Sequence, residues 1–403
     1  MWSLDNLFGQ SPILMDGGLG TTLEDELGAT VTQSPIWSAY PIANNPEAVV
    51  KSHLRFLEAG ARIILTATYQ CSFDSLHRAG FDEAEARLLM SKGVQLADEA
   101  RARFQAQVSD AGHITQKRSI FIALSLGPLG ATLKPTQEFE GCYPPPYGPR
   151  GFVTGGLNEN AFENPHDEIL AIDALARFHF DRLLVFAADH RTWDLIDCIA
   201  FETVPLRREV KAIRKAMGWL QRKFTEDGAT QALKPWWISC VFPFNGDSPE
   251  NLVSGGKKAP MDGFLEAAYQ DDSIDTSILL KPSGFGINCT ELKYIPALVD
   301  KVRHYFQAQE TWPYWLVLYP NGNDTYDKAK QAWIEAEDDH GEEWAKELIS
   351  IIEKSMVITS QRLVLGGCCR TGPKEISTLA RHLEKTEHIT RTFSLANNFR
   401  QCQ

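Results

Sequence analysis

A closed (β/α)8 barrel is the fold class that this sequence predicts, on three observations. Eight apolar, β-branched runs of strand length recur along the 403 residues. Segments with helical spacing follow most of these runs, and strands that alternate with helices pair in parallel. The alternative, a doubly wound open sheet, is expected to carry Gly-x-Gly-x-x-Gly after its first strand. Here that strand leads into Gly18-Leu19-Gly20-Thr21-Thr22-Leu23, which lacks the third glycine, so we prefer a single barrel domain over residues 1–403.

The strands and helices can be assigned in order along the chain. The predicted strands are Ile13–Asp16, Ala61–Thr68, Ser119–Leu126, Leu195–Glu202, Trp236–Phe242, Gly284–Asn288, Trp315–Tyr319 and Arg362–Leu365. Asn45-Pro46-Glu47 is typical of a helix start, with an N-cap residue before proline, and Gly60 is typical of a helix end. Five further segments combine good helix formers with helical spacing: residues 82–106, 205–220, 291–307, 327–354 and 373–385.

Residues 129–165 depart from this alternation. They contain Pro144-Pro145-Pro146, many glycines and several aromatic residues. A loop of this length in a compact domain is usually functional or disordered. Because it follows the third strand, we expect it at the active end of the barrel, either as a lid or as a surface elaboration without a catalytic role. We also expect a solvated helix with its connection over Glu335–Glu343 and a tail over residues 386–403.

Composition and charge exclude several classes of protein. The net charge is 40 − 52 = −12 and no basic run exceeds two residues, so neither nucleic acid nor an anionic membrane surface is expected as a partner. The first lysine or arginine is Lys51, so we expect no secretory or mitochondrial targeting segment. No apolar run approaches the ~20 residues that span a bilayer. We therefore expect a cytoplasmic protein with reduced cysteines, and the sequence carries no signal for its oligomeric state.

Two cysteine motifs carry the strongest chemical signal. Cys289 directly follows the sixth predicted strand, and Cys368 and Cys369 follow the eighth. Alternate strands of a barrel contribute side chains to the same layer, so thiols from two even-numbered strands can converge near the axis. Three thiolates would fill three positions of a zinc tetrahedron and leave the fourth open, as in catalytic zinc sites. From the pattern alone, buried core thiols and a redox pair remain as alternatives.

Two acids also stand at strand ends. Asp16 follows the first strand and Glu202 ends the fourth. A buried acid at the mouth of a barrel is costly unless it meets a cation or strong hydrogen-bond donors. The ten histidines show no His-x-x-His or His-Glu-x-x-His spacing, so a histidine-dominated metal site is not expected. The remaining cysteines lack matched partners and are interpreted as structural: Cys71, Cys142, Cys198, Cys240 and Cys402.

An ordered set of motifs resembles one known family. The motifs are Met-Asp-Gly-Gly-Leu-Gly-Thr-Thr-Leu (15–23), Phe-Glu-Thr-Val-Pro (201–205), Gly-Ile-Asn-Cys-Thr (286–290), Tyr-Pro-Asn (319–321) and Gly-Gly-Cys-Cys-Arg-Thr-Gly-Pro (366–373). In this order they resemble the homocysteine S-methyltransferases of the cobalamin-independent, zinc-dependent type, over about residues 13 to 385. The resemblance implies an enzyme that methylates the thiol of homocysteine to give methionine.

The resemblance also implies roles for individual residues. Zinc would be held by Cys289, Cys368 and Cys369, and the homocysteine ammonium group by Asp16 and Glu202. Tyr69 matches an aromatic position that lines the family's pocket. The implied methyl donor is a sulfonium compound, S-methylmethionine in preference to S-adenosylmethionine, whereas a related branch uses betaine. Methylation of another thiol or selenol, and a non-enzymatic sensor built on the adjacent thiols, are the competing functions.

Overall fold

The computed structural model describes most of the chain. The described residues are 3–9, 12–27, 36, 39–110, 119–156, 158–253, 256–271, 279–309, 315–322, 325–327, 332–334, 341–355 and 362–384. The predictions made for Cys402, for the tail over residues 386–403 and for residues 335–340 lie outside the described residues.

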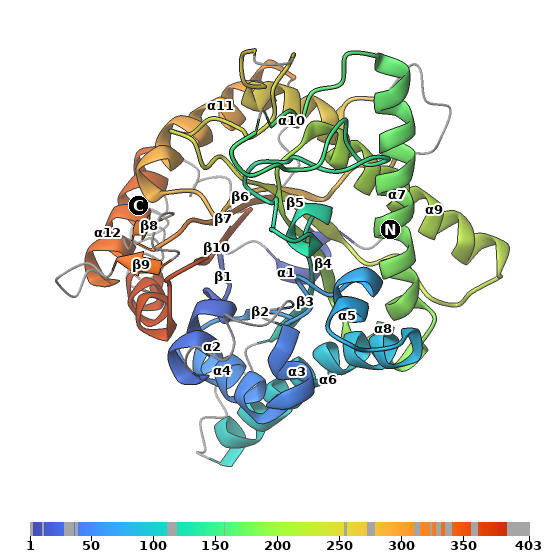
Figure 1. Ribbon diagram of the computed structural model, residues 1–403. Coiled ribbons are helices and arrows are strands. Elements are labelled where there is room, and N and C mark those ends of the chain that lie inside the picture. Colours follow the sequence, from blue (N-terminus) through green and yellow to red (C-terminus); the bar gives the residue numbers. More distant parts are fainter. Residues whose placement is uncertain are drawn as a thin grey trace, which may run out of the picture.

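Eight parallel strands form the centre of the molecule (Figure 1). They are β1 (Ile13–Leu14), β2 (Ile63–Leu65), β3 (Phe121–Leu126), β4 (Cys198–Val204), β5 (Trp236–Cys240), β6 (Gly284–Asn288), β7 (Trp315–Tyr319) and β10 (Leu363–Leu365). Their order in the sheet is β1-β10-β7-β6-β5-β4-β3-β2, so from β2 onward each strand pairs with the next one along the chain, and β1 pairs with the last, β10. All eight overlap the strands predicted from the sequence.

The two end strands of this sheet meet each other. Met15, just after β1, forms a parallel bridge with Ile63 of β2. The backbone N–H of Asp16 donates to the carbonyl of Ile63 at 3.0 Å, and that of Arg62 donates to the carbonyl of Leu14 at 2.8 Å. The sheet therefore curls into a nearly closed barrel of the TIM type, which confirms the predicted fold class.

Helices surround the barrel in the order expected for β/α units (Figure 1). They are α2 (Leu19–Leu27), α3 (Tyr40–Asn44), α4 (Pro46–Glu58), α5 (Phe73–Arg78), α6 (Glu83–Asp110), α7 (Pro165–Ala187), α8 (His190–Leu195), α9 (Arg207–Glu226), α10 (Met261–Tyr269), α11 (Ile295–Ala308), α12 (Gly341–Lys354) and a last helix over residues 373–384. Asn45 caps α4 as predicted, because its side chain accepts from the N–H of Ala48. No described helix is long and apolar enough to cross a membrane.

The sequence prediction was wrong in one segment and incomplete in others. The helix predicted over residues 327–354 begins too early, because β8 (Thr325–Asp327) and β9 (Ala332–Ile334) form an antiparallel pair and α12 begins only at Gly341. The residues of this pair include threonine, tyrosine, tryptophan and isoleucine, which favour strands over helices. The sequence analysis also assigned no helix to α1 (Leu4–Phe8), α2, α3, α5, α7, α8 or α10.

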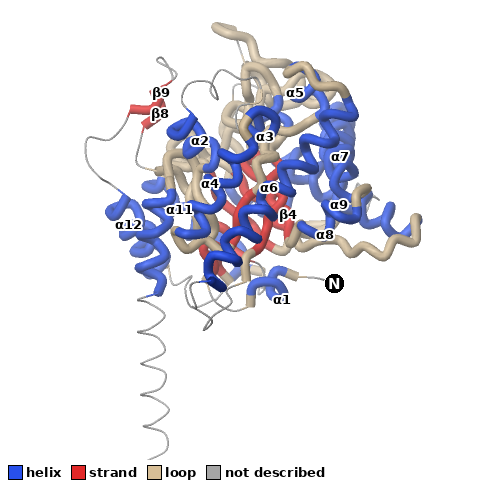
Figure 2. The backbone as a smooth tube through the Cα atoms, turned by 90° about the horizontal axis from the view of Figure 1, so that it is seen from below, coloured by secondary structure: helices blue, strands red, loops and turns tan. Residues whose placement is uncertain are grey.

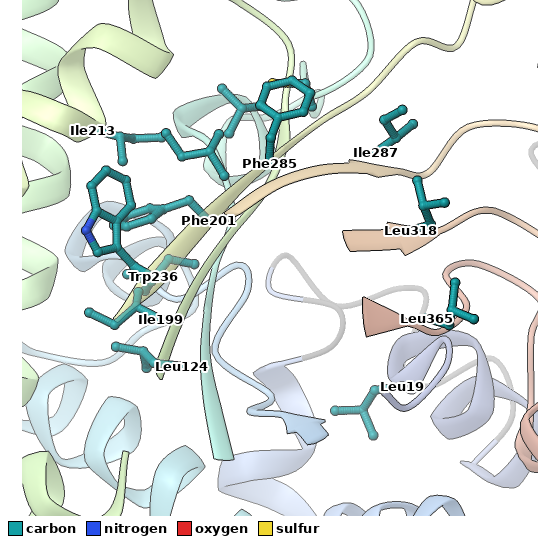
Figure 3. Close-up of a cluster of buried hydrophobic side chains, with 14 of the residues drawn as sticks. Leu19, Leu124, Ile199, Phe201, Ile213, Trp236, Phe285, Ile287, Leu318 and Leu365 are labelled. Carbon is teal, nitrogen blue, oxygen red and sulfur yellow. The ribbon is translucent and has the colours of Figure 1, made fainter. Parts of the chain in front are cut away.

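The barrel has an inner and an outer apolar layer, because successive strand side chains point to opposite faces. Phe201 and Leu318 point outward and pack with the helices in the larger cluster, part of which Figure 3 shows. Their sequence neighbours Ala200 and Val317 belong to the inner cluster. Both layers are buried, so the strands are fixed on two sides.

A short N-terminal helix closes one end of the barrel. Figure 2 shows α1 (Leu4–Phe8) at the end of the strands opposite to α5, which follows β2. The ring of Phe8 makes edge-to-face contacts with Phe121 and Trp315, each at 5.2 Å between centroids. Asp5 accepts from the indole N–H of Trp315 at 3.1 Å and pairs with Arg362 at 2.8 Å. A binding or catalytic site is therefore expected at the opposite end of the barrel, where the carboxyl ends of the strands lie.

We expect Phe8→Ala to destabilise the whole barrel. Phe8 is 6% exposed and fills the inner layer, so its truncation should lower the free energy of unfolding by about 3 kcal/mol. Leu88→Ala, on the 71% exposed side chain of Leu88 in α6, is the matched control and should change it by less than about 0.5 kcal/mol. Denaturant unfolding of both variants measures the difference. An equal change in the free energy of unfolding in the two variants would show that the packing of α1 against the end of the barrel does not stabilise the fold.

Candidate metal centre

The three thiols predicted to converge lie together at the carboxyl ends of the strands. Cys289 follows β6 and Cys368 and Cys369 follow β10, the two strands that flank β7. Their sulfur atoms all lie within 4.8 Å of one another, with 4.0 Å between those of Cys289 and Cys369. Sulfurs on a tetrahedral zinc ion are ~3.8 Å apart, since each Zn–S bond is ~2.3 Å. The donor set therefore fits a zinc ion, and it is the single such group among the described residues.

The loop after β7 joins the two cysteine loops. The N–H of Asn321 donates to the carbonyl of Thr290 at 3.0 Å, next to Cys289. On its other side, the carbonyl of Pro320 accepts from the N–H of Cys368 at 2.9 Å. The N–H of Gly322 donates to the carbonyl of Cys369 at 2.8 Å. The sequence analysis used Tyr-Pro-Asn only as a family motif and missed this bridging role, which depends on β7 lying between β6 and β10.

Glycines let the first and last strand ends touch backbone to backbone. A Cβ atom on Gly18 would lie 2.4 Å from the carbonyl oxygen of Cys368, and one on Gly367 would lie 2.0 Å from the hydroxyl of Thr371. The N–H of Gly367 donates to the carbonyl of Asp16 at 3.0 Å, and that of Gly18 donates to the carbonyl of Thr371 at 2.8 Å. The glycines around the cysteine pair therefore serve close approach, and they fix Asp16 beside the thiols.

Asn288 connects the ends of β4 and β6. Its side-chain oxygen accepts from the N–H of Thr203 at 2.9 Å, and its amide nitrogen donates to the hydroxyl of Thr203 at 2.8 Å. That hydroxyl donates in turn to the sulfur of Cys289 at 3.8 Å. Thr203 and Cys289 have φ angles of 58° and 47°, a left-handed conformation that costs of order 1 kcal/mol or more for each residue. The surrounding hydrogen bonds hold this strained geometry, which aims the thiol of Cys289 at the other two.

The thiols act on one another's ionisation. The pKa of Cys369 is lowered well below its usual range, because the thiols of Cys289 and Cys368 donate hydrogen bonds to its sulfur. The pKa of Cys289 is raised well above its usual range, first by its hydrogen bonds with Cys368 and Cys369 and then by burial. Without a cation the cluster therefore favours one thiolate flanked by thiols. A bound divalent metal would instead hold all three deprotonated.

Asp16 and Glu202 are buried beside the cluster. One carboxylate oxygen of Asp16, Oδ2, accepts from the N–H of Leu65 at 2.8 Å, whereas Oδ1 has no hydrogen-bond partner in the described part of the chain. Glu202 accepts a short hydrogen bond from the hydroxyl of Ser125. Burial raises the pKa of Asp16 well above its usual range and that of Glu202 to about 8. The charge of Cys368 raises both further, so acids and thiols share one low-dielectric space.

Tyr69 lines the same space from the segment after β2. Gly127 has no room for a side chain, because a Cβ atom there would lie 2.8 Å from the ring of Tyr69. The carbonyl of Tyr69 accepts from the N–H of Gly127 at 3.0 Å and from the buried guanidinium of Arg182 at 3.2 Å. Burial raises the pKa of Tyr69 well above its usual range, and the charges of Glu138 and Cys289 raise it further. The sequence analysis missed Arg182, which carries no local signal because it lies on α7.

The long segment 129–165 is anchored where it begins. The carboxylate of Glu209, on α9, accepts from the N–H of Leu129 at 2.7 Å and from the hydroxyl of Tyr143 at 2.6 Å. The ring nitrogen Nε2 of His179 lies 3.0 Å from the same carboxylate. These buried contacts tie the segment to α7 and α9. The predicted role as a lid stays a prediction.

We expect Glu202→Gln to change the pH dependence of stability. The pKa of Glu202 is raised from 4.5 to about 8 in the folded chain. Its contribution to stability is therefore full below pH ~4.5 and lost as the pH rises through ~8. Between pH 5 and pH 8 the metal-free variant should gain about 3 kcal/mol of unfolding free energy relative to the native protein. Denaturant unfolding in reducing, metal-free buffer measures it, and a difference that does not vary with pH would contradict the assignment.

Comparison with known proteins identifies relatives that match most of this chain. The chain is 29% identical over 374 residues to "Homocysteine S-methyltransferase 2" of Arabidopsis thaliana, which covers 92% of each chain. It is 28% identical over 372 residues to "Selenocysteine Se-methyltransferase" of Brassica oleracea var. italica, covering 92% of this chain and 88% of the relative. These relatives match over nearly their whole length.

Solved structures show the same fold. The metallated form of the homocysteine methyltransferase MmuM from Escherichia coli superposes with a TM-score of 0.62 at 22% identity, covering 93% of this chain and 98% of that one. Its oxidized form gives 0.61 at 23% identity, covering 93% and 97%. The family model described as "Homocysteine S-methyltransferase" matches residues 13–383, almost the entire barrel. With that match, the chain belongs to the homocysteine S-methyltransferase family.

Proposed function

We propose that this protein is a zinc-dependent enzyme that transfers a methyl group from a sulfonium donor to the thiol of L-homocysteine, giving methionine. The observation that carries the proposal is the meeting of three thiols and two buried acids at one end of the barrel. Three sulfurs suit zinc with an open fourth position, and the acids suit an amino acid's ammonium group. A ligand that carries both a thiol and an ammonium group satisfies the two requirements together.

Cys289, Cys368 and Cys369 would hold the zinc ion. When bound, zinc would deprotonate a thiol presented to its open position and orient that sulfur, which removes the need for a general base. The chain supplies the rest by rigidity, because backbone hydrogen bonds join the loop of Pro320 and Asn321 to both cysteine loops. The hydroxyl of Thr203 and the amide of Asn288 face the sulfurs of Cys289 and Cys368, at 3.8 Å and 4.0 Å. These donors favour the thiolate form of the sulfurs.

Asp16 and Glu202 would bind the ammonium group of homocysteine. The unpartnered Oδ1 of Asp16 is buried and lacks a donor among the described residues, which is costly for a carboxylate. Glu202 keeps its proton up to a pH of about 8 in the absence of a cation, and an ammonium group would replace that proton. Fixing the substrate at this end places its thiol at the cysteine cluster. Orientation of this kind can lower a barrier by several kcal/mol.

The methyl donor is proposed to be S-methylmethionine, with S-adenosylmethionine as the second choice. A sulfonium carries its methyl group on a cation, and the acids and thiolates of the site favour cations. The aromatic face of Tyr69 would add about 0.5–2 kcal/mol to the binding of such a cation. A selenol acceptor is a second candidate, which the name of the Brassica relative favours.

A donor and acceptor panel with Cys368→Ala as the negative variant tests this function. We expect the native protein to contain about one zinc ion per chain and to form methionine from homocysteine and S-methylmethionine. Cys368→Ala should lose both, since two thiolates no longer hold the metal. Cys142→Ala, at a buried cysteine outside the cluster, should keep both.

Full methyl transfer by a zinc-free native protein would refute the proposed zinc dependence. Faster transfer to selenocysteine than to homocysteine at matched concentrations would select the second candidate. Reversible loss of two thiols under mild oxidation, with no methyl transfer from any sulfonium, would instead favour the thiol sensor.

We expect Asp16→Asn to weaken homocysteine binding without loss of zinc. Asparagine can still accept from the N–H of Leu65, but it carries no charge for the ammonium group. Removing one charged hydrogen bond costs about 1.5–3 kcal/mol, so kcat/KM for homocysteine should fall about 10- to 100-fold. Steady-state kinetics and metal analysis of the same preparation measure both quantities. An unchanged KM for homocysteine would remove Asp16 from the substrate site.

A further inference from the structure

Glu138 is a third acid at this end of the barrel, and the proposed function does not use it. It lies on the segment 129–165, and its carboxylate oxygen Oε2 is buried without a hydrogen-bond partner in the described part of the chain. The charged group that acts on it, Glu140, is another acid. Burial raises the pKa of Glu138 to about 7 and the charge of Glu140 adds to this, against the opposing hydrogen bonds of its own backbone and of Thr136. A carboxylate oxygen that is buried without a donor is retained at a cost unless a cation meets it.

Close backbone contacts and hydrogen bonds fix the turn that carries Glu138. A Cβ atom on Gly130 would lie 2.6 Å from the backbone of Gln137 and 2.8 Å from the nitrogen of Glu138, so the two turns touch directly. The N–H of Gln137 donates to the carbonyl of Gly130 at 2.8 Å, and the N–H of Gly141 donates to the carbonyl of Gln137 at 2.8 Å. The turn that carries Glu138 is therefore fixed against residues 129–132, directly after β3.

The carboxylate of Glu138 acts on two groups of the candidate site. Its charge raises the pKa of Tyr69, and it opposes the lowering of the pKa of Cys369. The backbone brings this segment to Tyr69, because the N–H of Gly127 donates to the carbonyl of Tyr69 at 3.0 Å and the side-chain amide of Gln70 donates to the carbonyl of Ala131 at 3.3 Å. Asp16 and Glu202 reach the same space from strand ends, whereas Glu138 comes from the segment that follows β3.

We propose that Glu138 binds the sulfonium centre of the methyl donor beside Tyr69, an inference that rests on the proposed function. In the transfer, the bond between the donor sulfur and its methyl carbon breaks, and its electron pair stays on that sulfur. The thiolate sulfur of homocysteine supplies the pair for the new bond to the methyl carbon. The donor thereby becomes a neutral thioether, and its attraction to the carboxylate of Glu138 ends.

This loss of charge determines what Glu138 can contribute. The positive charge is largest in the bound donor and falls as the methyl group leaves, so the carboxylate stabilises the ground state more than the transition state. It therefore lowers the KM for the donor without raising kcat. It also distinguishes the donor from the thioether product, which lacks the transferred methyl group and has a neutral sulfur.

Glu138→Gln tests the inference in the zinc-loaded protein. No transfer occurs without homocysteine, so the Kd of S-methylmethionine can be measured directly by calorimetry. We expect this Kd to rise 10-fold or more, while kcat does not fall and zinc content is unchanged. Glu140→Gln makes the same charge change two residues away and should leave the Kd of S-methylmethionine within twofold of the native value.

Methionine separates the sulfonium from the donor's own ammonium group. Both molecules carry the ammonium, but methionine has a neutral sulfur. At saturating homocysteine, the inhibition constant of methionine against the donor should stay within twofold in Glu138→Gln. An equal rise for methionine and for S-methylmethionine would show that Glu138 binds the ammonium instead, which overturns the proposal.

A second variant and the activity of the native protein separate this inference from the proposed function. If the glutamine variant does not fold, Glu138→Asp, which withdraws the charge by one methylene group, should raise the Kd of S-methylmethionine several-fold and leave that of methionine unchanged. A native protein that transfers methyl groups from S-methylmethionine while both Glu138 variants keep the native Kd would refute this inference alone. A native protein without transfer from any sulfonium would refute the proposed function itself.

Discussion

The burial of several acidic groups in one space is the constraint on which this site depends. Asp16, Glu202 and three thiols share the end of the barrel, and burial makes the ionised form of each costly. Without a cation the carboxyls hold protons to unusually high pH, and one thiolate is stabilised by its neighbouring thiols. A divalent metal and an ammonium group can replace these protons. Binding of the metal and of the ammonium group therefore replaces protons on the thiols and carboxyls with cations.

That exchange needs sulfur and oxygen atoms held in place before any ligand arrives. The barrel does this through backbone contacts, because the backbones of the loops after β1, β6, β7 and β10 hydrogen-bond to one another. Glycines at positions 18 and 367 permit approaches that no side chain would allow. The strained φ angle of Cys289 is held by neighbours on β4 and β6. A site built this way keeps its geometry when its charge changes.

The parts of this site that could be predicted from the sequence are those with local signals. Strand runs and their order placed Cys289 and the pair Cys368-Cys369 at neighbouring ends of one barrel. Ser125 and Glu138 carried no such signal, since their importance comes from segments that meet only in the folded chain. The pairing of β8 with β9 was missed for a related reason, because a helical pattern in residues 327–354 concealed residues that favour strands.

Charge over the course of the reaction separates the buried acids into two kinds. The ammonium group proposed for Asp16 and Glu202 keeps its charge from substrate to product, so these contacts stabilise every stage about equally and serve to orient the thiol. The charge proposed to face Glu138 disappears as the methyl group moves, so that contact is strong only before the reaction. A site that held both cations with equal strength throughout would bind its products as tightly as its substrates. With Glu138 on a separate segment, Asp16 and Glu202 can keep homocysteine oriented while the contact to the donor weakens as its sulfur becomes neutral.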